Sequence, residues 1–154
     1  MDQLLGATLD FQLSERETHY RDRVRDFIAR HIAPRNEDYV AQAKNGERWK
    51  VIPVIEELKE VARAEGLWNL FMPPNSNNAP IEDTFQFEGP RLTNLEYALC
   101  AEEMGRAGWA SEVFNCSAPD TGNMEVLHRY GTLAQKEQWL GPLMRGEIRS
   151  AFLM

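Results

Sequence analysis

The last third of the chain constrains the fold most, because helix starts and helix stops alternate along it. Residues 132–135 (TLAQ) have the form of a capping box, in which the first and fourth side chains satisfy free backbone N–H groups at a helix start. Gly131 and Gly146 stand where helices are expected to end. Residues 148–154 (IRSAFLM) depart from the helical pattern and predict the beginning of a β-strand. The segment therefore predicts helices followed by one strand that has no partner in this sequence.

The earlier part of the chain carries the same kind of helix signals. Capping boxes at 14–17 (SERE) and 93–96 (TNLE) predict helix starts, and Pro53 suits a first helical turn. Pro34 is expected to end the first helix and to leave residues 36–50 as a linker. The predicted helices are 14–32, 53–65, 93–105, a helix from Ser111 or Asp120 to Tyr130, and a last helix from 132. Together they predict an all-α bundle of about five to six helices.

The last predicted helix has two features that can be checked in the structure. Its apolar residues Trp139, Leu140 and Leu143 are expected to face the core. The pair Gly141 and Pro142 is expected to end or kink the helix.

Composition bounds the class of protein. A chain of 154 residues with 43% hydrophobic and 27% charged residues is typical of one globular domain. Its formal charge of -7 argues against nucleic acid as a partner, since affinity for phosphates comes from clustered Lys and Arg. No segment approaches the ~20 apolar residues of a membrane span. Two cysteines, Cys100 and Cys116, form neither a disulfide framework nor a metal site, so we expect a cytoplasmic protein.

Motifs that carry chemistry by themselves are missing from the sequence. It has no phosphate-binding glycine loop, no nucleophile elbow, no paired cysteines at metal spacing and no zinc-protease motif. The pair Glu102 and Glu103 is predicted to lie on a solvated helix face. Residues 118–122 (APDTG) either leave room for a ligand beside a helix start or form an ordinary tight turn. Residues 73–90, rich in Pro and Asn, are expected to form a long loop.

At these residues the sequence resembles the N-terminal helical domain of the acyl-CoA dehydrogenase family. The resemblance covers nearly the whole chain from about Leu13 onward. Residues 66–71 with 114–116 (GLWNLF and FNC) look closest to the subgroup that is fused, in animals, to an aminoglycoside-phosphotransferase-like domain. The segments that carry the family resemblance, in order, are 95–105 (LEYALCAEEMG), 118–127 (APDTGNMEVL), 129–131 (RYG), 135–140 (QKEQWL) and 146–152 (GEIRSAF).

The resemblance implies a flavoenzyme that introduces an α,β double bond into acyl-CoA thioesters and is reoxidised by electron-transferring flavoprotein. It implies FAD as cofactor, a homo-oligomer, a helical domain at 1–147 and the first strand of a following β domain at 148–154. Phe152 and Met154 match positions that touch the flavin in the family. In the family a further stretch lines the acyl-tail pocket. The residues of this chain that match it are Phe114, Asn115, Ala118, Pro119 and Gly122.

The resemblance assigns no catalytic residue to this chain, because the glutamate base of the family lies in a C-terminal portion beyond residue 154. The helix 93–105 is expected to form the opposite wall of the acyl pocket. A different interpretation is a stand-alone, non-catalytic helical interaction module, which the apolar run 151–154 (AFLM) would favour as an exposed edge. In an isolated chain, residues 148–154 are expected to be disordered, to pair with another molecule, or to fold back as helix or coil.

Overall fold

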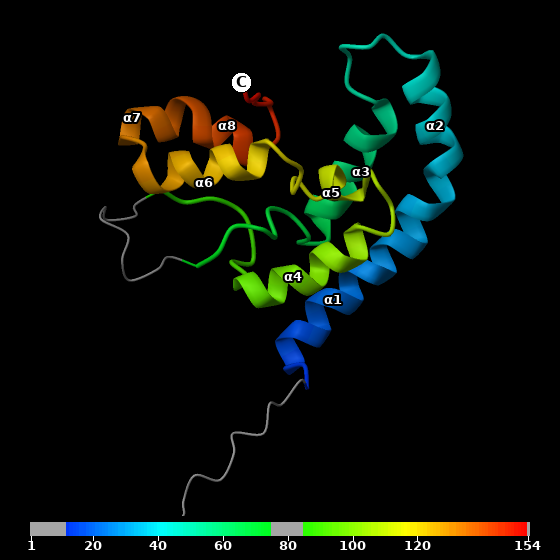
Figure 1. The fold of residues 1–154 in the computed structure, drawn as a ribbon, viewed down its shortest axis with the longest axis horizontal. Coiled ribbons are helices and arrows are strands. Elements are labelled where there is room, and N and C mark those ends of the chain that lie inside the picture. Colours follow the sequence, from blue (N-terminus) through cyan, green and yellow to red (C-terminus); the bar gives the residue numbers. More distant parts are fainter. Residues whose placement is uncertain (1–11, 75–84, 154) are drawn as a thin grey trace, which may run out of the picture.

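The computed structural model describes residues 12–74 and 85–153, and within these ranges the chain is helical, with no strand. This confirms the predicted all-α class. The longer helices lie in two groups that meet in the middle of the molecule (Figure 1). One group is built on residues before 114, and the other on residues after 119.

The first helix continues past the proline that was expected to end it. Helix α1, Glu15–Phe27, begins at the predicted capping box, in which Ser14 accepts from the backbone of Glu17 and Glu17 accepts from the backbone of Ser14. A π-helical turn, Ile28–Ile32, and a 3-10 turn, Ala33–Arg35, lead into helix α2, Asn36–Asn45. The predicted linker at 36–50 is therefore wrong over its first ten residues.

Local hydrogen bonding explains how the helical path survives Pro34. The wide turn before it is closed by the Ala33 N–H, which donates to the carbonyl oxygen of Ile28. Pro34 then lies in the first turn of the 3-10 segment, where the missing N–H of proline costs least. Helix α2 ends at Asn45, and Gly46 follows it in an extended conformation.

The central helices agree with the sequence prediction. Helix α3, Pro53–Ala64, has proline in its first turn, and Gly66 follows it with a φ of 68°. Helix α4, Asn94–Met104, begins at the predicted capping box of Thr93. The ambiguity between Ser111 and Asp120 resolves into two helices, a short α5, Ala110–Val113, and α6, Asp120–Tyr130.

The last helical run is continuous but irregular. Helix α7, Leu133–Gln135, passes through a π-helical turn, Lys136–Leu140, into α8, Gly141–Met144, whose first turn accommodates Pro142. Leu140 and Leu143 are buried as predicted, whereas Trp139 is 49% exposed. The wider π turn shifts residues out of the 3.6-residue register, so Trp139 leaves the buried face.

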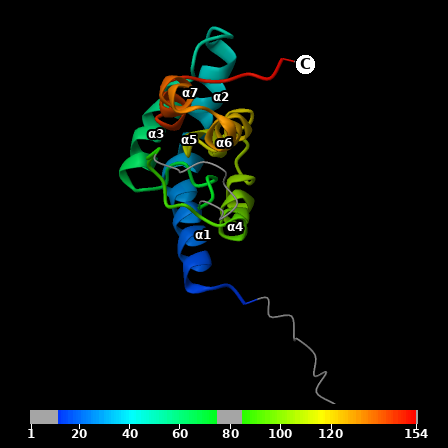
Figure 2. The ribbon, with the colours of Figure 1, turned by 90° about the vertical axis from the view of Figure 1, so that its left-hand side faces the viewer.

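Two packing relationships define the arrangement of the helices. Helix α1 runs along α4, and α3 packs against both α2 and α5. Helix α6 lies beside the run α7–α8 at the other end of the molecule (Figures 1 and 2). The connection between α5 and α6, residues 114–119, therefore joins the two groups.

A single apolar core holds the two groups together. Phe27 of α1 packs edge to face on Phe114, with ring centroids 5.1 Å apart. Trp68 is buried, and its Nε1 donates to the carbonyl oxygen of Met144 at 2.8 Å. Phe85 and Phe87, at the end of the loop predicted at 73–90, pack against this core, while residues 75–84 of that loop lie outside the described residues.

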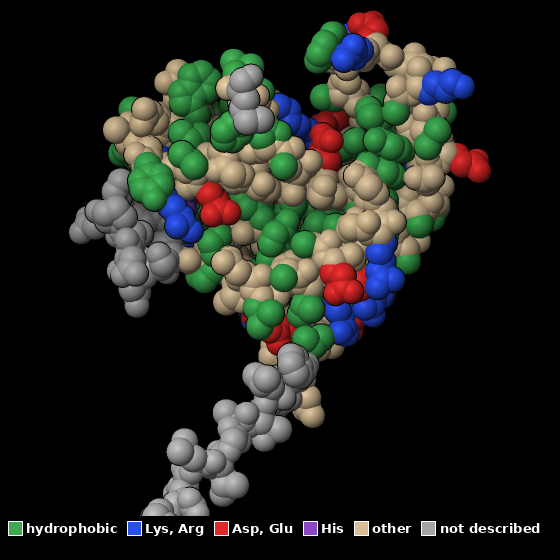
Figure 3. Space-filling model, viewed as in Figure 1, with side chains coloured by type: hydrophobic (Ala, Val, Ile, Leu, Met, Phe, Trp, Pro, Cys, Tyr) green, Lys and Arg blue, Asp and Glu red, His purple; other side chains and the backbone are tan. Residues whose placement is uncertain are grey.

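Charged side chains on α1 are interspersed rather than gathered by sign (Figure 3). Arg25 reaches across to α4, where Glu103 is only 2% exposed and also contacts Arg106. The prediction of a solvated face is thus wrong for Glu103 and right for the exposed Glu102. Two arginines on the protein surface compensate the buried carboxylate, which explains how it tolerates burial.

The predicted start of a strand has no ladder in the described part of the chain. Residues 149–153 follow Gly146 without regular secondary structure. A strand exists only where its N–H and C=O groups pair with a neighbour, and no other strand is present in 12–74 or 85–153. Of the three expectations for the isolated segment, the described residues 149–153 correspond to coil.

Candidate functional site

The residues predicted to line an acyl pocket cluster around the connection between α5 and α6. Phe114 and Asn115 directly follow the short helix α5. Ala118 and Pro119 immediately precede α6 and are joined by a cis peptide bond. Gly122 lies in the first turn of α6. The structure brings all five into one region, but it places them in two different environments.

Phe114 and Asn115 are part of the buried framework. Phe114 is fully buried against Phe27. The amide nitrogen Nδ2 of Asn115 donates to Oδ1 of Asn69 at 2.7 Å and to the carbonyl oxygen of Leu143 at 3.1 Å. Asn69 in turn donates to the carbonyl oxygen of Met144 at 2.9 Å. These two asparagines therefore tie the segments around 69 and 115 to the end of the last helical run.

Ala118, Pro119 and Gly122 lie at the surface. Ala118 and Gly122 are exposed, and Pro119 is half-buried. A Cβ built on Gly122 would meet no atom within 4 Å. These three residues thus form a low, apolar surface strip beside the first turn of α6, with open space in front of Gly122.

A shallow hollow of about 160 Å³ lies on the α4 side of the same connection. Helix α4 contributes Tyr97, Ala101 and Met104, and the segment that follows it contributes Gly105, Gly108 and Ser111. Burial raises the pKa of Tyr97, and its hydrogen bond with Cys116 adds to the shift. The hollow therefore adjoins the residue that directly follows Phe114 and Asn115.

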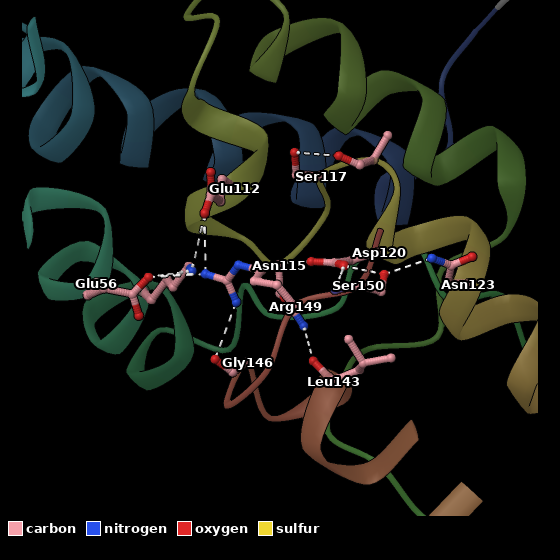
Figure 4. Close-up of polar contacts among 12 residues, drawn as sticks. Glu56, Glu112, Asn115, Ser117, Asp120, Asn123, Leu143, Gly146, Arg149 and Ser150 are labelled. Atoms are coloured by element: carbon pink, nitrogen blue, oxygen red, sulfur yellow. Dashed lines mark hydrogen bonds and ion pairs between the residues drawn. The ribbon is translucent and has the colours of Figure 1, made fainter. Parts of the chain in front are cut away.

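A polar cluster fixes the segment after Gly146 to α3, α5 and α6 (Figure 4). Nη2 of Arg149 lies 3.1 Å from Oε1 of Glu56 and 3.2 Å from Oε1 of Glu112. Nζ of Lys59 lies 2.8 Å from the same Glu56 oxygen and 3.6 Å from that of Glu112. Arg149 and Lys59 therefore neutralise two carboxylates that share a narrow space.

The next residue of that segment is anchored to α6. Ser150 donates from its backbone N–H at 2.7 Å and from its hydroxyl at 2.5 Å, both to Oδ1 of Asp120. Its Oγ also accepts from Nδ2 of Asn123 at 2.7 Å. Asp120 is only 7% exposed, and its Oδ2 lies 3.9 Å from Nε of Arg149. Asp120 and Asn123 are three residues apart on α6, so they face the segment together.

The residue predicted to touch a flavin lies just beyond this anchor. Phe152 is 65% exposed, and Leu153 is 97% exposed. Met154, the other predicted flavin contact, lies outside the described residues. The structure therefore brings the predicted flavin-contacting segment next to the start of α6, close in the chain to Ser150.

Besides Tyr97, Glu112 and Cys116 in this region have a raised pKa. Burial is the main cause of the raised pKa of Glu112, and the neighbouring carboxylates Glu56 and Asp120 add to it. Burial raises the pKa of the Cys116 thiol to about 12, so this cysteine stays protonated and unreactive at neutral pH. Nothing in these environments resembles an activated nucleophile or a poised base.

Sequence reasoning missed the polar cluster because its members are scattered along the chain. Lys59 gave one usable signal: it shares the buried stripe of α3 with Ile55, Leu58 and Ala62, where a lysine needs a partner. Asp120 and Ser150 gave none, since acidic residues near helix starts and serines in coil are ordinary. Among the described residues no group of three His, Cys, Asp or Glu could hold a metal ion. No helix described is long and apolar enough to cross a membrane.

Comparison with known proteins gives a consistent result. Residues 14–147 match the family model for the acyl-CoA dehydrogenase N-terminal domain. Acyl-CoA dehydrogenase family member 11 of Gallus gallus is 48% identical over 136 residues, covering 86% of this chain and 16% of that protein. Family member 10 of Mus musculus is 50% identical over 128 residues, covering 83% of this chain and 11% of that protein.

Two mycobacterial proteins extend the comparison. The probable acyl-CoA dehydrogenase FadE2 of Mycobacterium tuberculosis is 43% identical over 152 residues, covering 95% of this chain and 33% of that protein. A solved Mycobacterium abscessus protein assigned to the same enzymes superposes with a TM-score of 0.73 at 43% identity, covering 90% of this chain and 34% of that one. The chain thus spans between 11% and 34% of the length of each of these relatives.

Proposed function

Because this chain belongs to the acyl-CoA dehydrogenase family, we propose that it serves as the N-terminal helical domain of an FAD-dependent enzyme that introduces an α,β double bond into acyl-CoA thioesters. The observation that carries the proposal is the match of residues 14–147 to the N-terminal domain of that family. The all-α fold of the described residues is compatible with it.

The proposed domain boundary lies at 147. Residues 1–147 form the helical domain, and residues 148–154 form the first strand of a β domain supplied by a longer chain. The relatives support this division, because the match spans only 16% of one and 33% of the other. The exposed Phe152 and Leu153 support it as well, since a strand edge of this kind is normally covered.

The proposed acyl-pocket wall combines a surface strip with a rigid backing. Ala118, Pro119 and Gly122 would contact the acyl tail, because they are small or apolar and accessible. Phe114 and Asn115 would support the pocket wall without touching the acyl tail, since both are buried and hold the connection between α5 and α6 in place. The hollow beside α4 is lined by Tyr97, which contacts Cys116, and this supports α4 as the opposite wall.

The proposed cofactor contact is the segment around Phe152 and Met154. The largely exposed ring of Phe152 fits a flat cofactor, because an accessible aromatic face can pack against another ring. When bound, FAD supplies the two-electron acceptor for the reaction. This chain contributes no catalytic residue; it shapes the pocket and excludes water from one side. In this proposal the enzyme is reoxidised by electron-transferring flavoprotein, assembles as a homo-oligomer and is located in the cytoplasm.

The test begins with the gene. We expect the reading frame to continue beyond residue 154, and the longer protein to purify with bound flavin, visible near 450 nm as about one FAD per chain. We expect saturated acyl-CoA thioesters of increasing length to bleach that absorbance anaerobically. A longer protein that binds no flavin, or whose flavin no acyl-CoA reduces, would refute the proposed activity.

A matched pair of variants tests the pocket wall in the longer enzyme. Gly122→Leu should raise KM for long acyl chains several-fold, because its side chain would fill the open space beside α6. Ala134→Leu, an equivalent enlargement on the exposed surface of α7, should leave KM unchanged. Equal effects of the two variants would argue against a pocket at Gly122.

The interpretation as a non-catalytic interaction module predicts the opposite result for the reading frame. It requires a stop codon after residue 154 and a stable oligomer that covers the exposed Phe152 and Leu153. Light scattering on the chain of residues 1–154 distinguishes a monomer from such an oligomer.

A further inference from the structure

The hydrogen bonds of Ser150 concentrate on one buried carboxylate. Both its backbone N–H and its hydroxyl donate to Oδ1 of Asp120, at 2.7 and 2.5 Å. The hydroxyl oxygen is in turn fixed by the amide of Asn123 at 2.7 Å. A side chain held as donor and acceptor at once, together with its own backbone N–H, has little rotational freedom left. Ser150 is therefore a fixed point in a segment without regular secondary structure.

The position of Asp120 makes its carboxylate a good acceptor for the two hydrogen bonds from Ser150. Asp120 is the first residue of α6, where a carboxylate is stabilised by the free N–H groups of the helix start. It is 7% exposed, so water competes poorly for Oδ1. Its second oxygen faces Nε of Arg149 at 3.9 Å. The Asp120 carboxylate thus interacts with two adjacent residues of the segment. It accepts hydrogen bonds from Ser150 and attracts the positive charge of Arg149.

The neighbouring Arg149 adds a second attachment in a different direction. Its guanidinium contacts Glu56 of α3 and Glu112 of α5, and Nη1 donates to the carbonyl oxygen of Gly146 at 3.3 Å. Residues 149 and 150 are therefore held from three helices. Beyond them, Ala151, Phe152 and Leu153 are all exposed.

We propose that Asp120, assisted by Asn123, is a positioning residue that fixes Ser150 and thereby sets the direction in which residues 151–153 leave the helical domain. This rests on the proposed function, in which Phe152 contacts the flavin. An extended chain advances ~3.3 Å per residue, so Phe152 lies only about 7 Å along the chain from the fixed point. An anchor this close narrows the volume that the ring samples before the cofactor binds. It would lower the entropy cost of assembling the flavin site.

The anchor can be tested on residues 1–154 without any cofactor. In amide hydrogen exchange, the Ser150 N–H should be protected in the wild-type chain. Asp120→Ala should lower that protection roughly tenfold or more while the amides of α1 and α4 keep theirs. Glu125→Gln is the matched control on the same helix, since the ion pair that the described residues give Glu125 is with the exposed Arg129 at 3.6 Å. An unprotected Ser150 amide in the wild-type chain would overturn the proposal.

A second variant tests the anchor even if Asp120→Ala does not fold. Ser150→Ala removes the hydroxyl but leaves the backbone N–H and Asp120 in place. If Asp120→Ala unfolds the chain, Ser150→Ala must still increase exchange at residues 150–153 without changing the melting temperature by more than the control does. If it leaves exchange at 150–153 unchanged, the hydroxyl anchor does not hold the segment and the proposal is wrong.

The consequence for the site is tested in the longer enzyme. Asp120→Ala should weaken FAD retention several-fold with little change in KM for acyl-CoA, and Glu125→Gln should do neither. Unchanged flavin affinity in Asp120→Ala would overturn the positioning role. A longer wild-type protein that binds no flavin would instead refute the proposed function, and the exchange data would still decide whether Asp120 holds Ser150.

Discussion

Glu103 of α4 and Arg25 of α1 form an ion pair that joins these two packed helices. Oε1 of Glu103 accepts from Nη2 of Arg25 at 2.6 Å and from Nε at 3.1 Å. Its other oxygen lies 3.0 Å from Nε of Arg106. The hydrogen bond from Arg25 is the main reason that the pKa of Glu103 lies below its usual value. The buried carboxylate is therefore ionised and fully partnered.

Glu103→Gln should lower the free energy of unfolding by about 1.5–3 kcal/mol at pH 7, because hydrogen bonds to a charged group are lost in a buried place. We expect the lower end, since Arg25 remains half-exposed and water can replace part of the contact. Glu102→Gln, on the exposed neighbour, should change stability by less than about 0.5 kcal/mol. Urea unfolding of the two variants measures the contrast.

The pH dependence of this pair has a definite sign. Because the pKa of Glu103 is lower in the folded chain than the value of 4.5 in the unfolded one, its contribution is complete above pH 4.5. It is lost as pH falls through the folded pKa. The difference between wild type and Glu103→Gln should therefore shrink on acidification; a constant difference from pH 7 to pH 3 would contradict the assignment.

Glu112 should behave in the opposite way. Its pKa is raised, first by burial and then by Glu56 and Asp120, so the folded chain holds a proton there more tightly than the unfolded chain does. The stability contributed by the protonated form is complete below pH 4.5 and is lost as pH rises through the folded pKa. Relative to wild type, Glu112→Gln should gain stability as pH rises from 4 to 7.

Measurement of that effect needs a comparison at fixed salt, because Arg149 and Lys59 face the same carboxylate and their attraction is screened by ions. Thermal unfolding at several pH values gives the slope for each variant. Glu137→Gln, which alters an exposed carboxylate on the last helical run, should reproduce the wild-type slope. If the stability of Glu112→Gln changes with pH by the same slope as that of the wild type, Glu112 does not titrate in this range.

Asn115 combines a buried amide with backbone strain. It has a φ of 56° and donates to Asn69 and to the carbonyl oxygen of Leu143. Asn115→Ala should lower the free energy of unfolding by about 2–4 kcal/mol, because buried acceptors lose their donor and alanine tolerates positive φ less well than asparagine. Asn94→Ala, at an exposed position in α4, should change it by less than about 0.5 kcal/mol. Equal losses would refute the buried-network role.

The helix boundaries were predictable where a local signal decides them. Three capping boxes, at Ser14, Thr93 and Thr132, form as the sequence indicated, since each depends on residues only three positions apart. Pro34 misled the prediction because its effect depends on whether the preceding turn can widen. A π turn is a tertiary adjustment that no residue pattern announces. The same kind of turn moved Trp139 to the surface.

The candidate site was predictable only in part. The positions from 114 to 122 followed from family resemblance, but their division into a buried backing and an exposed strip did not, because burial depends on what packs behind them. Asp120, Lys59 and Arg149 meet across as many as 90 positions of sequence, and Ser150 joins them through its backbone as well as its hydroxyl. Such clusters exist only after the chain has folded.

Two glycines near the site should respond to alanine with opposite signs. Gly146 has a φ of 72°, and an added Cβ would lie 3.0 and 3.2 Å from two ring carbons of Trp68. Trp68 is buried and bonded to Met144, so its ring cannot move aside easily. Gly146→Ala should therefore destabilise the chain by at least about 1–2 kcal/mol, the ordinary cost of left-handed backbone, with crowding added.

Gly122 provides the matched comparison within helix α6. An added Cβ there meets nothing within 4 Å, and the backbone is helical. Gly122→Ala should stabilise the chain by about 0.5–1 kcal/mol, because alanine loses less conformational freedom than glycine on entering a helix. Urea unfolding of both variants at pH 7 gives the two signs directly. A loss of stability in Gly122→Ala would mean that the space beside α6 is filled in solution, and the accessible strip proposed for the acyl tail would then have to lie elsewhere.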